Sequence, residues 1–296
     1  MDHWDEIRTA YHVARAGTVS GAAEAMGIHH ATVIRHVDAL EARLGVKLFQ
    51  RHARGYTPTE AGADLARIAD ATEEQFIQLG ARLKGQGEEV TGDVVVTALA
   101  TFSRRLTPVL AGFQHEHPNT RVILRTGLRL FRLEYGEAHV AIRAGDAPTE
   151  PDNVALPFIN MDLSLCVAPS YVERYGLPTA NTLDQHRFIG GDDATSRAPF
   201  VRWIKENVPE ENIVFRVSDD VSLQQALLAG AGVGFAPKGQ HPDLIELLAP
   251  RPEWRSQFWL VTHVDLHRTA KVQAVLGHLK QAAKDWAAQE PGISLP

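Results

Sequence analysis

Residues 18–45 read TVSGAAEAMGIHHATVIRHVDALEARLG, and this stretch decides the fold of the N-terminal part of the chain. Thr18 is suited to cap a short helix that runs from Val19 to about Met26, and Gly27 can form a tight turn. A second helix then runs from about His29 to Leu44, where Gly45 stops it. Two helices joined by a short turn that contains glycine predict a helix-turn-helix, although the spacing alone also fits any small helical bundle.

The segments on either side complete a small domain and lead into a long helix. A first helix starts near Asp2, and helical spacing places its apolar side chains inward (Trp4, Ile7, Tyr11 and Ala14). Residues 47–58 predict a β-hairpin, or wing. From Thr59 about 28 residues without proline predict one helix of roughly 42 Å. Its apolar seam, which could pack on the same chain, consists of Leu65, Ile68, Thr72, Phe76, Leu79 and Leu83.

The second helix of the pair has a face that suits DNA. Its inward stripe is predicted to be Val33, Val37, Leu40 and Leu44. The N-terminal end of such a recognition helix enters the major groove, where arginine can read guanine and threonine or isoleucine can contact other bases. The alternative is a solvated face with a few cations. The candidate DNA-binding residues are Thr18, Ser20, His29, His30, Ala31, Thr32, Ile34 and Arg35 on the helices, and Arg51 and Arg54 on the wing.

From Thr91 onward, short β-rich runs alternate with helical ones, which predicts an α/β domain with a largely parallel sheet. The predicted strands are Asp93–Leu99, Arg121–Leu124, His139–Arg143, Leu163–Ala168, Phe188–Gly190, Ile213–Val217 and Gly232–Phe235. The predicted helices are a run from about Leu106 that ends near Pro118, a short one near Leu128–Tyr135, and Ala198–Asn207, Val221–Ala229 and Thr269–Trp286.

Composition sets limits on the class of protein. The 296 residues are 44% hydrophobic and 22% charged, which is ordinary for a globular chain of two or three domains. Cys166 is the single cysteine, so no disulfide framework can form within one chain, and its apolar surroundings predict a buried, inert thiol. No apolar run approaches the roughly 18 residues of a membrane span, and the acidic N-terminus lacks a signal-peptide core. We therefore expect a soluble, cytoplasmic protein without a membrane partner.

The net charge of −6 argues mildly against affinity for nucleic acid. However, residues 1–60 hold seven basic and seven acidic side chains, so the excess acidity lies outside the predicted DNA-binding part.

Motifs for catalysis are missing from the sequence. There is no HExxH, no Gly-x-Ser-x-Gly and no Walker A loop, and the glycine-rich run 230–234 follows a helix instead of opening one. His115-Glu116-His117 ends a helix, and neighbouring helical side chains point apart. We therefore expect no catalytic residue, no metal and no cofactor. The alternative is an α/β enzyme or solute-binding module whose N-terminal helices are only structural.

Four pieces of the sequence stand together in a recognisable order and spacing: Ala22–Met26, Leu40–Gly45, Leu48–Arg51 and Thr59–Gly62. In these pieces the chain resembles the LysR-type transcriptional regulators, most strongly over residues 4–66. The family usually opens the recognition helix with Ser-Gln-Pro/Ser and has a second serine a few residues on. This chain has His29-His30-Ala31 and Ile34 at those positions, and Pro58 in place of the family leucine. These departures bear on base preference and not on the fold.

The resemblance implies an α+β multidomain protein. A winged helix-turn-helix DNA-binding domain (1–58) is followed by a linker and dimerisation helix (59–90) and an α/β effector-binding domain (91–296). The latter resembles periplasmic binding proteins, with two Rossmann-like subdomains, I (about 91–162 and 264–296) and II (about 163–263). The implied partners are double-stranded operator DNA, a small-molecule co-inducer, a second copy of the chain that pairs through the linker helix, and RNA polymerase. Two such dimers would join as a tetramer.

The crevice between the subdomains is the predicted effector site. Residues 100–103 follow a strand and open a helix, so their N–H groups and hydroxyls suit an anion. Arg143 or Arg197 could pair with a carboxylate. The candidate effector-binding residues are Ala100, Thr101, Phe102, Ser103, Gly127, Leu128, Arg143, Asp146, Ser196, Arg197 and Ser218. The alternative for each is an ordinary loop cap or surface cation. The predicted function is transcriptional regulation in response to a small, anionic metabolite.

Overall fold

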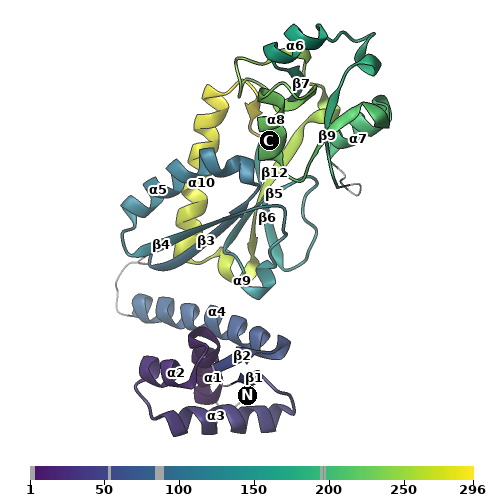
Figure 1. Ribbon diagram of the computed structural model, residues 1–296. Coiled ribbons are helices and arrows are strands. Elements are labelled where there is room, and N and C mark those ends of the chain that lie inside the picture. Colours follow the sequence, from purple (N-terminus) through teal and green to yellow (C-terminus); the bar gives the residue numbers. More distant parts are fainter. Residues whose placement is uncertain (1–3, 53–54, 84–89, 194–195, 197) are drawn as a thin grey trace. The chain divides into compact units, whose positions relative to one another are not determined.

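The computed structural model describes residues 4–52, 55–83, 90–193, 196 and 198–296 (Figure 1). It divides into two compact units, one formed by residues 1–89 with 134–137 and the other by 90–133 with 138–296. The first unit contains α1 (Trp4–Ala16), α2 (Val19–Met26), α3 (His30–Leu44), β1 (Phe49–His52), β2 (Gly55–Pro58) and α4 (Glu60–Leu83).

The helix-turn-helix is confirmed. The Thr18 hydroxyl caps α2 by accepting a hydrogen bond from the Gly21 N–H at 3.1 Å. Gly27 takes the left-handed conformation that the tight turn requires, with φ of 65°. Helix α1 lies between α3 and α4 and contacts both (Figure 1). The buried core that joins these helices consists of Ala10, Val13, Val19, Ala22, Val33, Val37, Leu40, Leu48 and Phe49.

Two predicted inward residues face solvent instead. Leu44 is 42% exposed, because the inward position near the end of α3 is taken by the buried Glu41. Trp4 is 40% exposed and packs edge to face on Phe76 of α4, with ring centroids 5.4 Å apart. The predicted cap Asp2 lies outside the described residues.

The wing leads directly into α4. Strands β1 and β2 pair antiparallel, and the Thr59 hydroxyl then accepts a hydrogen bond from the Gly62 N–H at 3.1 Å. The predicted seam of α4 divides between two faces. Leu65 packs against the core and Phe76, although 54% exposed, contacts Trp4 of α1, whereas Ile68 is 58% exposed. The side chains of Leu79 and Leu83 lie outside the described part.

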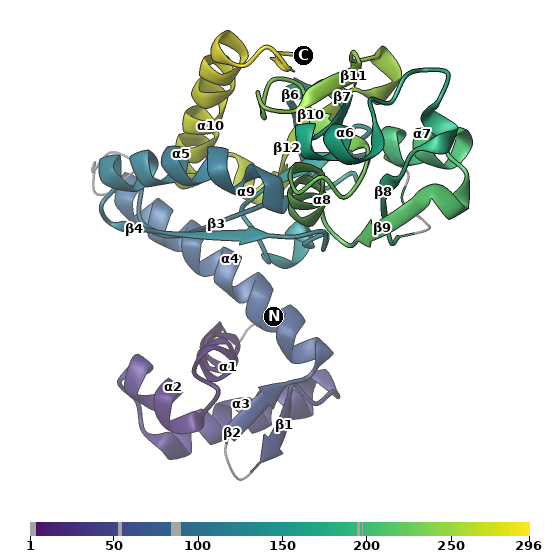
Figure 2. The same ribbon diagram turned by 45° about the horizontal axis from the view of Figure 1, so that its top comes forward.

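The second unit is an α/β domain built around a six-stranded sheet. Its elements are β3 (Gly92–Ala98), α5 (Ser103–Glu116), β4 (Thr120–Thr126), β5 (Val140–Ala144), β6 (Asn153–Met161), β7 (Leu163–Val167), α6 (Pro169–Tyr175), β8 (Phe188–Gly191), α7 (Pro199–Asn207), β9 (Ile213–Val217), α8 (Asp220–Leu228), β10 (Gly234–Pro237), β11 (Ile245–Leu248), β12 (Ser256–His263), α9 (Val264–His267), α10 (Ala270–Gln289) and β13 (Ile293–Ser294). Helices α5 and α10 pack together beside this sheet (Figure 2).

The sheet order is β13-β6-β12-β5-β3-β4. Strand β3 runs parallel to β4 and β5, but β12 runs antiparallel to both β5 and β6. The sheet is therefore mixed and not largely parallel, because β12 returns through its middle in the opposite direction. The predicted division placed the residues of β12 in subdomain II (about 163–263). In the structure β12 pairs with strands of subdomain I in the six-stranded sheet.

The second half of the domain has its own small sheets. Strand β7 pairs antiparallel with β10 and β11, and β8 pairs parallel with β9. A bridge between Phe188 and Val233 joins the two groups. The buried residues Tyr171, Phe235 and Trp254 belong to its core.

Two boundary predictions were wrong. In place of a helix over 128–135 there is one 3-10 turn, Leu133–Tyr135. The preceding residues read Leu-Arg-Leu-Phe-Arg over 128–132, and Leu128 and Leu130 are 60% and 71% exposed, so this segment has no buried helical face. The strand expected at Gly232 begins at Gly234. Over the described residues, none of the helices is both long and apolar enough to cross a membrane.

Candidate DNA-binding and effector sites

The N-terminal end of α3 is an exposed surface of the head. His29, His30, Ala31 and Arg35 are exposed there, and so is Ser20 on α2. Among the residues that the structure describes, none forms an ion pair or hydrogen bond with the Arg35 side chain. Its charge therefore remains available for an external acceptor.

Other predicted DNA-binding residues have structural contacts. The Thr18 hydroxyl is used as the cap of α2, and the half-buried Ile34 packs against the head core. Thr32 is also half-buried. Arg54 lies outside the described residues.

Arg51 on the wing is already paired within the head. Its Nη2 donates to Asp38 and, at 3.2 Å, to Oε2 of Glu41. Its guanidinium also lies over the ring of Tyr56, 5.4 Å from the centroid. These contacts hold the wing against α3. The carboxylates of Asp38 and Glu41 also offset the positive charge of Arg51, which was expected to contact DNA phosphates.

Glu41 is a positioning residue that the sequence analysis missed. Its side chain is 2% exposed and accepts hydrogen bonds from the backbone N–H groups of Leu48 and Phe49, at 2.9 and 3.2 Å. Burial raises the pKa of this carboxyl, but the hydrogen bonds from Lys47, Leu48 and Phe49 outweigh burial, so the pKa lies below its usual value. A signal was present, because Glu41 stands four residues after Val37 and thus on the inward face.

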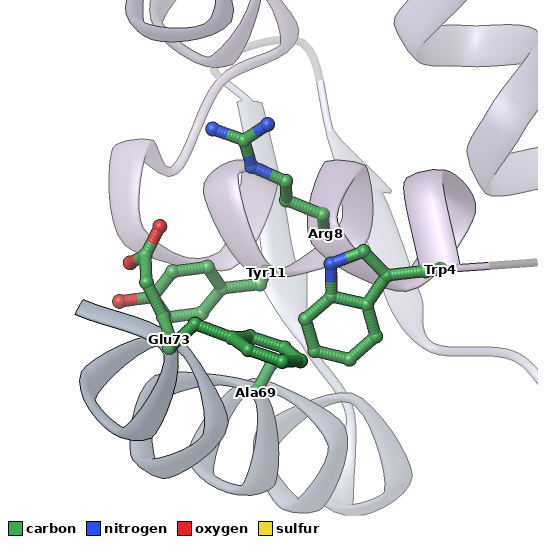
Figure 3. A pocket seen from close by; sticks show the side chains of 6 residues that line it. Trp4, Arg8, Tyr11, Ala69 and Glu73 are labelled. Atoms are coloured by element: carbon green, nitrogen blue, oxygen red, sulfur yellow. The ribbon is translucent and has the colours of Figure 1, made fainter. Parts of the chain in front are cut away.

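A pocket of about 310 Å³ lies between α1 and α4 (Figure 3). It is lined by Trp4, Arg8, Tyr11, Ala69, Glu73 and Phe76. The Tyr11 hydroxyl donates to Asp70 and accepts from Arg15 at 3.0 Å, and burial is the largest of the effects that raise the pKa of Tyr11. The pocket lining thus combines the rings of Trp4 and Phe76 with the charged side chains of Arg8 and Glu73.

The predicted effector loops of the first half are partly used by the fold. Residues 100–102 form a 3-10 turn, and the Ser103 hydroxyl donates to the carbonyl oxygen of Ala100 at 2.7 Å. Thr101 is half-buried, whereas Phe102 is 1% exposed and packs on Phe258, so its ring belongs to the core. Leu128 and Asp146 are exposed, and Gly127 is half-buried.

Arg143 is the best-placed cation among these residues. Its side chain is 14% exposed, with Nη1 3.3 Å from Oε1 of Glu150 and Nη2 donating to the carbonyl oxygen of Phe131 at 3.2 Å. Its Nε is buried and lacks a hydrogen-bond partner among the described residues. A buried donor without an acceptor is unfavourable, so this edge of the guanidinium would gain from an acceptor.

The second half contributes two of the predicted serines. Ser196 accepts a hydrogen bond from the Ala198 N–H at 3.4 Å, and Ser218 is exposed next to Asp219, which caps α8. Arg197 lies outside the described part. Helix α8 contacts the 3-10 turn 100–102, so elements carrying predicted residues of both halves meet.

A separate pocket of about 240 Å³ lies in the second half of the domain. Cys166 lines it, and burial raises the pKa of this thiol to about 12. The thiol is buried, as predicted. None of the predicted effector residues lines this pocket; its other lining residues are Ser164, Ala236, Pro237, Lys238, Gly239, His241, Pro242, Leu244, Glu246 and Pro291.

A winged helix-turn-helix with an exposed recognition helix, on one chain with a two-part α/β domain, defines a transcriptional regulator of the ligand-responsive class. Residues 4–63 match the bacterial regulatory helix-turn-helix of the lysR family, and residues 87–284 match the LysR substrate binding domain. The chain belongs to the LysR family of transcriptional regulators, with a helix-turn-helix DNA-binding domain and an effector-binding domain.

Individual relatives agree with this assignment. The chain is 28% identical over 245 residues to the HTH-type transcriptional regulator IlvY of Escherichia coli, covering 79% of this chain and 81% of IlvY. Full-length LysG from Corynebacterium glutamicum, solved with its effector arginine, has a TM-score of 0.68 at 18% identity and covers 95% of this chain and 98% of LysG. Full-length CbnR in complex with its target DNA has a TM-score of 0.50 at 21% identity, over 94% and 99% of the two chains. The two structures support the fold.

Proposed function

We propose that this regulator binds operator DNA by inserting the N-terminal end of α3 into the major groove. The observation that carries the proposal is the exposed Arg35, whose side chain pairs with none of the described residues. His29, His30 and Thr32 occupy the same end of the helix, and an exposed arginine there can read guanine bidentately. Arg51 then supports the wing more than it contacts phosphate.

Substitution of Arg35 tests this assignment. Arg35→Ala should weaken binding to the DNA upstream of the protein's own gene by about 1–3 kcal/mol. It should also lower the ratio of the affinity for this DNA to the affinity for a scrambled duplex. Arg43→Gln is the matched control, because it removes one charge from the other end of α3, where Glu6 already pairs with Arg43 at 2.6 Å. Equal losses in the two variants would count against base reading by Arg35.

We further propose that the effector is a small anionic metabolite bound beside Arg143 and the turn 100–103. The buried Nε of Arg143 without a described partner supports a carboxylate acceptor, and α5, which begins at Ser103, has no acidic residue in its first turn. The structure of LysG holds its effector arginine, which carries an α-carboxylate although its net charge is positive. Effector binding would shift the population toward a closed crevice and so change how the dimers engage the operator.

Calorimetric titration with small carboxylates tests the effector proposal. Arg143→Ala should abolish binding, whereas Glu150→Gln should preserve or tighten it, since Glu150 competes for the same guanidinium. Unchanged binding in Arg143→Ala, or an absence of carboxylate binding by the unaltered protein, would contradict it.

The remaining parts of the proposal concern assembly. Ile68 and Phe76 expose apolar surface on α4, which supports pairing of this helix with its twin. We propose that dimers join as a tetramer on DNA, that RNA polymerase is a further partner and that the protein acts in the cytoplasm. Residues 1–58, 59–90 and 91–296 would serve as DNA-binding, dimerisation and effector-binding segments.

A further inference from the structure

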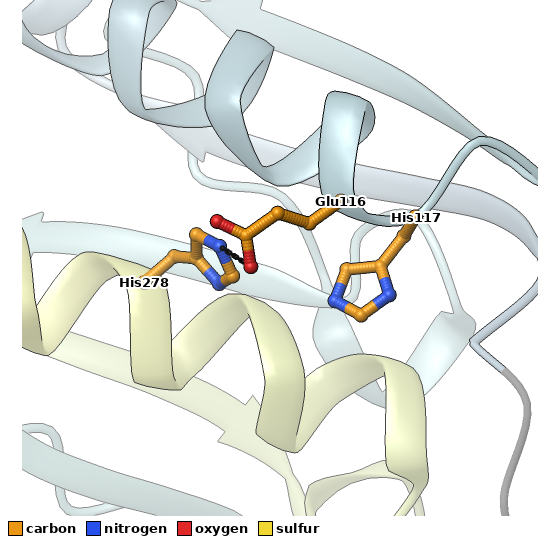
Figure 4. A group of neighbouring side chains, drawn as sticks. All are labelled: Glu116, His117 and His278. Atoms are coloured by element: carbon orange, nitrogen blue, oxygen red, sulfur yellow. Dashed lines mark ion pairs between the residues drawn. The ribbon is translucent and has the colours of Figure 1, made fainter.

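Three side chains that can ligate a metal meet where the end of α5 faces α10 (Figure 4). Glu116 is the last residue of α5, His117 follows as its C-cap, and His278 lies on α10. One carboxylate oxygen and two imidazole nitrogens from these residues lie within 4.8 Å of one another. The sequence shows only the adjacent pair Glu116 and His117, whereas the fold supplies the third group.

The orientation of His278 is informative. Its Nδ1 lies 3.1 Å from the carbonyl oxygen of Ala274, and because a carbonyl only accepts, Nδ1 carries the proton. In the neutral ring Nε2 then presents a lone pair, and this atom stands 3.3 Å from Oε2 of Glu116. Two atoms that both offer lone pairs at this separation need a cation between them, either a proton or a metal ion.

The separation of these two atoms favours a metal ion. Ligand atoms held tetrahedrally at about 2.0–2.1 Å from zinc lie about 3.4 Å apart. The 3.3 Å between Nε2 and Oε2 fits that value and exceeds the roughly 2.7–2.9 Å typical of a hydrogen bond between an imidazolium and a carboxylate, whereas the 4.8 Å limit on all three ligand atoms means that the side chains close in slightly on an ion.

The surroundings hold both rings in place. The buried Phe113 packs edge to face on His278, with centroids 5.3 Å apart, and lies 4.8 Å from the ring of His117. Donation from Nδ1 to a backbone carbonyl is also the arrangement that metal-ligating histidines usually have. Phe113 therefore contacts both imidazoles, and the hydrogen bond to Ala274 orients that of His278.

We propose that Glu116, His117 and His278 bind a divalent transition-metal ion, for which zinc suits the set of two imidazoles and one carboxylate. Water completes the coordination, because Glu116 is exposed. The ion links the end of α5 to α10. None of the predicted effector residues belongs to this cluster, so the site is separate from the proposed effector site.

Equilibrium dialysis of the full-length, tag-free protein against Zn²⁺, and separately against Co²⁺, tests the site. The unaltered protein should bind one ion that Glu116→Gln and His278→Ala each weaken by at least about tenfold. The matched control is His115→Ala, which alters an exposed neighbouring histidine outside the cluster and should leave binding unchanged. Zn²⁺ should raise the thermal unfolding midpoint of the unaltered protein and the control, and raise that of the two cluster variants by clearly less at the same Zn²⁺ concentration.

Two results would overturn the proposal. One is equal Zn²⁺ affinity in the unaltered protein and in Glu116→Gln, and the other is an absence of binding by the unaltered protein at about 1 mM Zn²⁺. His278→Ala removes a ring that packs on Phe113, so circular dichroism without metal checks its fold. Glu116→Gln changes an exposed side chain and keeps the test decisive if the histidine variant misfolds.

Discussion

Glu41 and Arg35 lie six residues apart on α3, and the structure gives them opposite roles. Glu41 is buried and holds the wing through Leu48 and Phe49, whereas Arg35 projects from the exposed face. The sequence indicated Arg35 because a helical wheel separates inward from outward residues. It could not indicate the pairing of Arg51 with Asp38, or that of Arg143 with Glu150, because such contacts depend on how separate segments pack.

His139 makes the stability of the effector domain depend on pH. It accepts a hydrogen bond at Nδ1 from the Val95 N–H at 3.0 Å, and burial, followed by the charge of Lys271, lowers its pKa from 6.5 to about 3. The unfolded chain takes up a proton below about pH 6.5 while the folded chain does not. The contribution of His139 is therefore complete above pH 6.5 and declines as the pH falls toward 3.

Urea unfolding at pH 7.5 and at pH 5 measures this effect. The unaltered protein should lose more stability between the two pH values than His139→Gln, which cannot titrate there. Identical losses in the two proteins would show that His139 does not cause the pH dependence.

At the scale of elements, the helix α4 and the wing meet at Gly62. A Cβ atom at this position would stand 2.0 Å from the carbonyl oxygen of Leu48, so only glycine permits the close approach. This explains why glycine stands in the Thr59–Gly62 piece that indicated the family. The sequence revealed most helices and strands of the fold, because their periodicity is local, but it missed the short helices α6 and α9. It did not define β6 and β12, whose places depend on pairing across the sheet.

Substitution of Gly62 tests this contact. Gly62→Ala should lower the free energy of unfolding of the head by about 2 kcal/mol or more, because backbone must move. Gly112→Ala on α5 is the control, since nothing lies within 4 Å of a Cβ there, and it should be neutral or stabilising by up to about 1 kcal/mol. Thermal and urea unfolding give both values, and a Gly62→Ala variant as stable as Gly112→Ala would refute the close approach.

At the scale of the whole molecule, assembly should depend on the exposed face of α4. Ile68→Asp places a charge on a side chain that is 58% exposed and that the proposed dimer would bury. We expect sedimentation velocity to show monomers where the unaltered protein forms dimers or tetramers. Leu177→Asp, at a residue 53% exposed in the effector domain, controls for added charge and should keep the assembly. If Ile68→Asp sediments like the unaltered protein, α4 is not the dimer contact.

The distribution of charge also acts at this scale. The chain carries a net charge of −6, but residues 1–60 hold seven basic and seven acidic side chains. A head without net charge attracts DNA weakly in general, so affinity should come from base contacts and from two heads held in one dimer.

Fluorescence anisotropy with two duplexes, the chain's own upstream region and a scrambled version of equal composition, tests the central claim most directly. We expect the upstream duplex to bind at least about 1,000-fold more tightly, with an affinity that falls linearly with salt on logarithmic axes. Equal affinity for the two duplexes at every salt concentration, or no binding to either, would contradict the account of this chain as a sequence-specific regulator.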